Sequence, residues 1–195
     1  MFIQVIQGQT DDPTGLQQAF DQWRQQLQAG AQGWLGTTAG VTDDGQFVAV
    51  ARFADEESAR RNSDRPEQGE WWAQTSRLLK GEATFKDSTD VDEWGAGGSD
   101  DAGFVQIIQG RTDDRERWQQ EMSEMEPALA DQRPDVIGGT IAWYPDGSFN
   151  QTVYFTSEAE AREGERKMDE AGQGPSSAEQ DLRYFDLRDP WLASP

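Results

Sequence analysis

The sequence predicts an α+β protein in which one unit of secondary structure occurs twice. Three observations carry this prediction. Segments from the two halves match without a gap, an Asp-Gly pair marks a hairpin at the same place in each half, and apolar residues recur at helical spacing between the expected strands. The chain has 195 residues, which is enough for two such units.

The repeat runs at a constant offset of 102 positions, from Phe2/Phe104 to Arg60/Arg162. FIQVIQGQTDD opens the first copy and FVQIIQGRTDD the second, and the register holds to about residue 64. The sequence identity between the two copies is well above the roughly one-twentieth expected by chance. We therefore predict a first repeat at 1–94, a flexible Gly-rich linker at 95–102 and a second repeat at 103–195.

Each repeat begins with a short strand and a helix. The first strand is expected at Phe2–Gly8, and Asp12 followed by Pro13 is typical of a helix start, since Asp caps free N–H groups and Pro suits the first turn. An apolar stripe follows at helical spacing in both copies: Leu16, Ala19, Phe20, Trp23 and Leu27, then Trp118, Met122, Met125 and Leu129.

A hairpin, a second helix and a last strand complete each repeat. Asp44-Gly45 and Asp146-Gly147 predict tight turns. They join expected strands at Leu35–Val41 and Phe47–Phe53, and at Ile137–Tyr144 and Phe149–Phe155. Acidic or Ser caps open the second helices at Asp55 and Ser157. The last strands are expected near Ala83–Asp87 and Leu182–Leu187.

This order, β-α-β-β-α-β, is that of the ferredoxin-like split βαβ unit. Such a sheet carries helices on one face, so its other face needs a cover. We expect the two repeats to pack sheet against sheet, as a pseudo-twofold dimeric α/β barrel fused within one chain. Trp94 and Trp191, which follow the last strands, are expected to close the barrel ends.

Composition excludes several kinds of chemistry. There is no Cys and no His, so thiolate nucleophiles, disulfides, Cys-ligated metals and imidazole bases are absent. The net charge of −20 disfavours nucleic acid and anionic lipid as partners. No calcium-loop pattern, apolar span or signal peptide is found, so we expect no metal, no membrane and a cytoplasmic location.

The order of elements, the duplication and the passage GQFVAVARFADEESARRNSDRPEQGEWW resemble the dimeric α/β-barrel superfamily, and within it the antibiotic-biosynthesis-monooxygenase (ABM) domains. The passage GSFNQTVYFTSEAEAREGERK matches the same region more loosely. The resemblance covers nearly the whole chain. Its motifs are more specific for the fold than for an activity, because the superfamily contains monooxygenases, haem-degrading proteins and members without known function.

The resemblance implies two kinds of chemistry. Haem-degrading relatives use an axial His, but the matching stretch Glu70–Gln74 holds Trp71 and Trp72, so we expect no haem. Cofactor-free relatives oxidise electron-rich phenols with Trp, Asn, Arg and Tyr around a cavity. There the substrate loses a proton and its carbanion reduces oxygen, while the protein binds and polarises it.

Seven residues are candidates for such a site, each with a structural alternative. Arg52 and Tyr154 are repeat equivalents and could hold an oxyanion and move a proton, or form a rim pair. Gln4 and Gln106 would line the interior if their strand phase faces it, or make structural hydrogen bonds. Asn62 could also line the site, or cap a helix and take part in a surface ion pair. Trp72 and Trp143 could stack on a planar ligand, or pack in the core.

Two functions therefore remain open. One is a cofactor-independent monooxygenase, or a related enzyme, that acts on an aromatic or polyketide-like small molecule. The other is a non-catalytic small-molecule-binding or structural protein of the same fold. Convergence of Arg52, Tyr154 and Gln4 on an open cavity would favour the first, and an interior filled by Trp and Phe the second.

Overall fold

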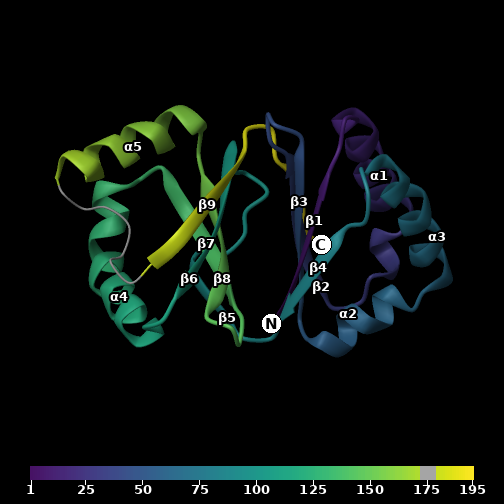
Figure 1. The fold of residues 1–195 in the computed structure, drawn as a ribbon, viewed down its shortest axis with the longest axis horizontal. Helices are drawn as coiled ribbons and strands as arrows, with labels where there is room; N and C mark the ends of the chain where they lie inside the picture. Colours follow the sequence, from purple (N-terminus) through teal and green to yellow (C-terminus); the bar gives the residue numbers. More distant parts are fainter. Residues whose placement is uncertain (172–178) are drawn as a thin grey trace. The chain divides into compact units, whose positions relative to one another are not determined.

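The computed structural model describes residues 1–171 and 179–195, without the side chains of 125–131 and 179. The chain forms two compact units (Figure 1). The first comprises Met1–Val91 together with Asp189–Pro195, and the second comprises Asp92–Arg188. Each unit is an antiparallel five-stranded sheet with its helices on one face, so the fold is α+β.

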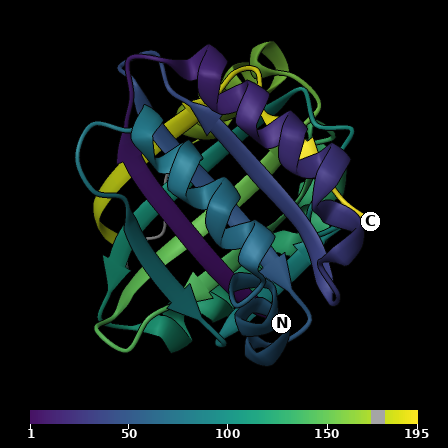
Figure 2. The ribbon, with the colours of Figure 1, turned by 90° about the vertical axis from the view of Figure 1, so that its right-hand side faces the viewer.

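The first unit follows the predicted order. Its elements are β1 (Phe2–Gln9), α1 (Pro13–Gln26), β2 (Trp34–Val41), β3 (Gln46–Phe53), α2 (Glu56–Ser63), α3 (Pro66–Thr75), β4 (Thr84–Ser88) and β10 (Trp191–Ala193), with short 3-10 turns at Gln28–Gly30 and Ser76–Leu78. The strand order is β10-β2-β3-β1-β4. In Figure 2, the purple α1 and the blue α3 lie in front of the strands.

The second unit repeats this arrangement. Its elements are β5 (Val91–Gly95), β6 (Phe104–Thr112), α4 (Arg115–Gln132), β7 (Val136–Trp143), β8 (Ser148–Phe155), α5 (Glu158–Glu170) and β9 (Glu179–Leu187). The strand order β5-β7-β8-β6-β9 matches that of the first sheet element by element. Two ferredoxin-like units with the order β-α-β-β-α-β are therefore present, as the sequence predicts.

The predicted helix caps and hairpin glycines are present in the structure. The Asp12 carboxylate accepts from Gly15 N at the start of α1, where Pro13 is the first helical residue. Asp55 caps α2 by accepting from Ser58 N at 2.7 Å, and Ser157 caps α5. Gly45 and Gly147 close the hairpins with φ of +82° and +79°, which glycine adopts without strain.

The last strand of each repeat joins the sheet of the other unit, and no local pattern in the sequence predicts this. β10 follows β9 in the chain but pairs with β2, with Trp191 opposite Ala39. β5 follows β4 but lies beside β7. The compact units therefore differ from the predicted repeats at their ends. The Gly-rich seam after β5 is partly fixed, because Ala96 N donates to Ile137 O and Gly97 N to Trp94 O.

Strand register assigns each residue to a face. In the first sheet, the helix-covered face contains the core of α1 packed on the strands, with Phe2, Leu16, Phe20, Trp23, Phe47 and Phe53 all buried. The opposite, helix-free face is also apolar and buried along its centre, at Ile3, Val5, Val48 and Val50. Burial of each such side chain contributes about 1.5–3 kcal/mol. Met125 and Leu129, predicted to extend the second stripe, lie among the residues whose side chains are not described.

Candidate functional site

A cavity of about 270 Å³ lies on the helix-covered side of the second unit, between β5, β7 and α4. Buried apolar side chains form its floor and exposed polar ones its rim. The lining residues are Asp92, Glu93, Trp94, Trp118, Gln119, Met122, Ser123 and Ile141. All of them belong to one unit, so the pocket is complete within it.

The pocket exists because the two units fill one equivalent position differently. A Cβ atom added at Gly36 would lie 3.0 Å from Ala193 O, and one added at the equivalent Gly138 would lie 2.8 Å from Trp94 O. Trp94 thus takes the place of Ala193 beside the neighbouring strand. Two residues earlier, Asp92 takes the place of Trp191.

In the first unit that position is filled by an indole. Trp191 is 9% exposed and packs against Phe20 and Phe47, with ring centroids 6.2 Å and 6.3 Å away. Its strand partner is Ala39, whose repeat equivalent is Ile141 in the pocket floor. The short carboxylate of Asp92 leaves the corresponding space open.

Polar contacts hold Asp92 in place. Its Oδ2 accepts from Trp143 Nε1 at 2.8 Å, and from Arg115 Nη2 and Gln119 Nε2 at 3.3 Å. The Arg115 guanidinium lies 4.6 Å from the Trp143 ring centroid, which is a cation–π distance. The other oxygen, Oδ1, accepts no hydrogen bond from the described residues, so one carboxylate oxygen remains available to a ligand.

This arrangement can bind and deprotonate a small aromatic molecule. Trp94 and Trp118 offer aromatic surface, and Asp92 offers an acceptor for a proton. An apolar cavity of about 150 Å³ holds benzene, so the volume here suits a ligand of about two fused rings. The Gln119 amide, also in the lining, can donate to an oxygen on such a ligand.

Trp143 is the predicted candidate nearest to this pocket. It is 4% exposed on the helix-covered face, and its ring meets that of Trp118 edge-on at 5.0 Å. It does not line the pocket but fixes Asp92 through its indole N–H. Trp143 therefore packs in the core, as its structural alternative predicts, and it also positions a residue of the pocket.

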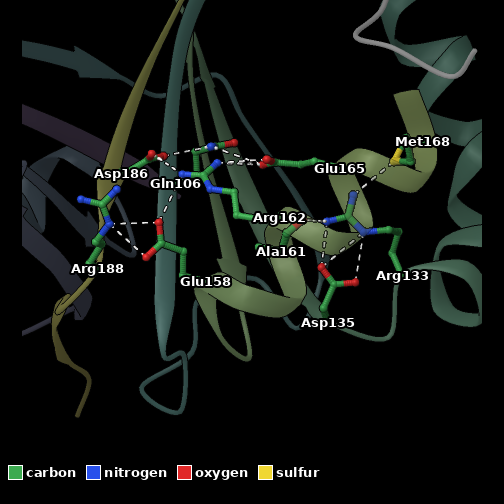
Figure 3. Close-up of polar contacts among 10 residues, drawn as sticks. All are labelled: Gln106, Arg133, Asp135, Glu158, Ala161, Arg162, Glu165, Met168, Asp186 and Arg188. Atoms are coloured by element: carbon green, nitrogen blue, oxygen red, sulfur yellow. Dashed lines mark hydrogen bonds and ion pairs between the residues drawn. The ribbon is translucent and has the colours of Figure 1, made fainter. Parts of the chain in front are cut away.

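Gln4 and Gln106 lie on the helix-covered faces rather than on the helix-free ones. Gln4 shares its face with Phe2, and its amide donates to Asp87 at 3.0 Å. Gln106 donates to Asp186 at 3.0 Å, within a network that also contains Arg162 (Figure 3). Neither amide therefore lies on the helix-free face of its sheet. Each donates a hydrogen bond to an Asp of the adjacent strand.

Asn62 and Trp72 have structural surroundings. Asn62 Oδ1 accepts from Arg65 Nη1 at 2.9 Å, and the same nitrogen donates to Leu27 O, so this group ties α2 to the end of α1. The ring of Trp72 is half-buried and meets Phe85 edge-on at 5.4 Å. Neither residue lines the pocket of the second unit.

Arg52 and Tyr154 occupy equivalent positions on the helix-free faces of their own sheets. Arg52 pairs with Ile3 and Gly36, and Tyr154 with Val105 and Gly138. Both are buried, at 8% and 0% exposure. Neither lies among the residues that line the pocket.

The helix-free face of the second sheet is more polar than that of the first. Asn150 and Thr152 stand where the first repeat has Val48 and Val50, and both are buried. Asn150 Nδ2 and the hydroxyl oxygens of Thr140 and Thr152 find no hydrogen-bond partner among the described residues. The repeats therefore differ on both faces.

Sequence reasoning missed Asp92, Trp118 and Gln119 as site residues. Helical spacing predicts Trp118 as part of an apolar stripe, and the structure confirms this, but the same side chain also lines the pocket. Asp92 follows the point where the repeat register ends, so no equivalent residue drew attention to it. Asp90 and Glu93 beside it are also acidic, and such a run is typical of a solvated segment.

No protein-family model matches the sequence, and no curated protein does. Solved structures do share its fold. A candidate monooxygenase from Fusobacterium nucleatum matches with a TM-score of 0.75 and 10% identity, over 99% of this chain and 94% of that one. A candidate monooxygenase from Lactobacillus acidophilus matches with a TM-score of 0.69 and 10% identity, over 99% of both chains. An anthrone oxidase-like protein matches with a TM-score of 0.59 and 8% identity, over 100% of this chain and 94% of that one.

The chain has the fold of these monooxygenase-like proteins. At such low identity the likeness shows the fold and leaves the reaction open. Within the described residues, no three acidic side chains are grouped in a way that could hold a metal ion. No helix in the described part of the chain is both long and apolar enough to cross a membrane.

Proposed function

We propose that the protein is an ABM-like, cofactor-independent monooxygenase whose substrate is a small aromatic molecule with an acidic C–H or O–H group, bound in the pocket of the second unit. The observation that carries the proposal is the open oxygen of Asp92 beside Trp94 and Trp118. A carboxylate placed among aromatic rings combines ligand binding with a base. The fold likeness to monooxygenase-like proteins supports the same reading.

The chemistry follows from the residues in the lining. Asp92 Oδ1 takes the proton from a methylene flanked by aromatic rings, and the Gln119 amide donates to the oxygen that gains charge. The carbanion then reduces O₂, which is the second substrate. Overall, a CH₂ group and O₂ become a C=O group and water, so no further reductant is consumed.

Arg52 and Tyr154, the predicted catalytic pair, are separate from this scheme. Each lies on the helix-free face of its sheet, whereas the pocket lies on the helix-covered side. The proposed base is therefore Asp92. Absence of a haem from the reaction remains a prediction.

The test is a titration of the whole chain with one- to three-ring phenols and anthrones. Tryptophan fluorescence reports binding, because Trp94 and Trp118 line the pocket, and an oxygen electrode reports turnover. Asp92→Asn keeps the shape and the acceptor but removes the base, so we expect retained binding and loss of oxygen uptake. Asp101→Asn, which removes one exposed acid of the same unit, is the matched control and should behave as wild type.

Three outcomes separate the alternatives. Saturable binding with oxygen uptake that Asp92→Asn abolishes supports the enzyme. Binding without uptake in wild type supports a non-catalytic ligand-binding protein. Absence of binding across the panel leaves the structural role and contradicts the proposal.

A further inference from the structure

The helix α4 presents two rows of side chains to the pocket of the second unit. Trp118 and Met122 are four residues apart, as are Gln119 and Ser123, and all four line the pocket. Side chains four apart in a helix are neighbours on one face, with Cβ atoms about 5–6 Å apart. One row is therefore apolar and the other polar, and the two follow the same stretch of the helix.

The two rows differ in burial. Trp118 is 3% exposed, and Met122 packs on the core cluster that contains Trp118 and Ile141. Gln119 and Ser123 are exposed, so they belong to the rim of the pocket. A ligand that lies along the helix thus meets apolar surface on one side and hydrogen-bonding groups on the other.

The proposed base lies at one end of the polar row. Gln119 Nε2 donates to Asp92 Oδ2 at 3.3 Å, and so does Nη2 of Arg115, which lies one turn earlier in the helix. Ser123 lies one turn later than Gln119, about 6 Å further along the helix axis. A ligand group bound by Ser123 is therefore remote from the atom that Asp92 deprotonates.

The hydroxyl of Ser123 is not used by its own helix. A Ser or Thr within a helix often donates to the carbonyl four residues earlier. Ser63 Oγ donates in this way to Ala59 O at 3.1 Å, and Thr75 Oγ1 does so to Trp71 O at 2.9 Å. Among the described residues, the Ser123 hydroxyl has no hydrogen-bond partner, so its donor and its acceptor are both available to a ligand.

We propose that Ser123 is a specificity-determining residue, which binds a second oxygen of the ligand at the end remote from Asp92. The substrate is then an aromatic molecule of about two fused rings that carries oxygen groups at both ends of one edge. Because a hydroxyl can donate and accept, Ser123 suits a phenol or a carbonyl oxygen. The inference rests on the proposed function, since it uses the same pocket, and it adds the chemical class of the substrate.

The experiment compares two probes, 2-naphthol and 2,7-dihydroxynaphthalene, whose second hydroxyl lies on the same long edge as the first. Quenching of tryptophan fluorescence in the full chain gives both dissociation constants. Wild type should prefer the dihydroxy probe. In Ser123→Ala, the ratio of the two constants should fall by about three- to tenfold, because a hydrogen bond of ordinary net strength contributes that factor. Comparing the ratio between proteins removes the effect of the two equivalent orientations of the symmetric probe.

Two further variants separate a hydrogen bond from a change of shape. Ser123→Thr keeps the hydroxyl and should keep the preference for the dihydroxy probe. Gln120→Ala changes an exposed residue of α4 that does not line the pocket, and should behave as wild type.

The outcomes distinguish this inference from the proposed function. An equal preference in Ser123→Ala and wild type would overturn the inference alone, because both probes would still bind. Loss of the preference in Ser123→Thr would also overturn it, since shape and not the hydroxyl would then decide. Absence of binding by either probe in wild type would contradict the pocket as a ligand site, and with it both proposals.

Discussion

The buried ion pair between Arg133 and Asp135 offers the sharpest test of how the second unit is held together. Two parallel hydrogen bonds join the groups, Nε to Oδ1 at 3.0 Å and Nη2 to Oδ2 at 2.8 Å, and the side chains are 8% and 7% exposed (Figure 3). The guanidinium also lies 5.8 Å from the Phe155 ring centroid. The pair thus links the loop before β7 to α5 and β8.

Asp135→Asn removes the negative charge with little change in shape. Loss of one partner from a buried pair costs about 3–5 kcal/mol, because the remaining charge stays buried. The amide oxygen can keep one hydrogen bond, so we expect a loss near the lower end, about 3 kcal/mol. With a urea m-value of about 2 kcal/mol/M, the midpoint of unfolding should fall by about 1.5 M.

The assay is urea unfolding followed by circular dichroism. The matched control is Glu121→Gln, which breaks the exposed Arg117–Glu121 pair and should cost at most about 0.5 kcal/mol. Arg133→Met combined with Asp135→Leu should recover most of the stability, because no charge then remains buried. The reasoning fails if Asp135→Asn costs no more than the control, or if the double variant is as unstable as the single one.

Four further predictions test other parts of the fold. Ala normally favours a helix over Gly, but a Cβ at position 164 would lie 2.2 Å from Arg133 Nε. Gly164→Ala should therefore destabilise the protein by about 1–3 kcal/mol, and a urea midpoint that does not fall would contradict this. Hydrogen bonds from Ser58 lower the pKa of Asp55, so its stabilisation is present above the ordinary Asp pKa and lost as the pH falls through the lowered value. Asp55→Ala should therefore lower Tm at neutral pH and flatten its acid-side decline, and equal declines would contradict this. Thr152→Val should raise Tm, since it removes a buried hydroxyl without a described partner; a lower Tm would mean that the hydroxyl is engaged. The isolated segment 1–94 lacks β10 and should dimerise or aggregate in size-exclusion chromatography with light scattering, and a stable monomer would contradict the predicted fused barrel.

Elements with local signals could be predicted from the sequence. Asp12, Asp55 and Ser157 cap helices because each needs only nearby N–H groups, and Gly45 closes a hairpin because only the turn itself sets its φ. The strand exchange has no such signal. β10 is three residues long, and its pairing depends on an open edge at β2 that lies far away in sequence.

The faces of the strands were harder to predict for a related reason. Hydrophobic alternation reveals a buried face only when the other face is polar. In β1, Phe2 and Ile6 on one face are matched by Ile3 and Val5 on the other, so the pattern does not identify the face of Gln4. Only the register observed in the structure assigns Gln4 to the helix-covered side.

The difference between the two units is itself an argument for ligand binding. An apolar hollow lowers stability in proportion to its volume, and a core position is normally filled. The first unit shows that an indole fits at this position, since Trp191 packs there between Phe20 and Phe47. The second unit places Asp92 there instead, and three donors hold the carboxylate with one oxygen open. A change made for stability alone would have kept the filled form, so the open form is better explained by a ligand that fills it.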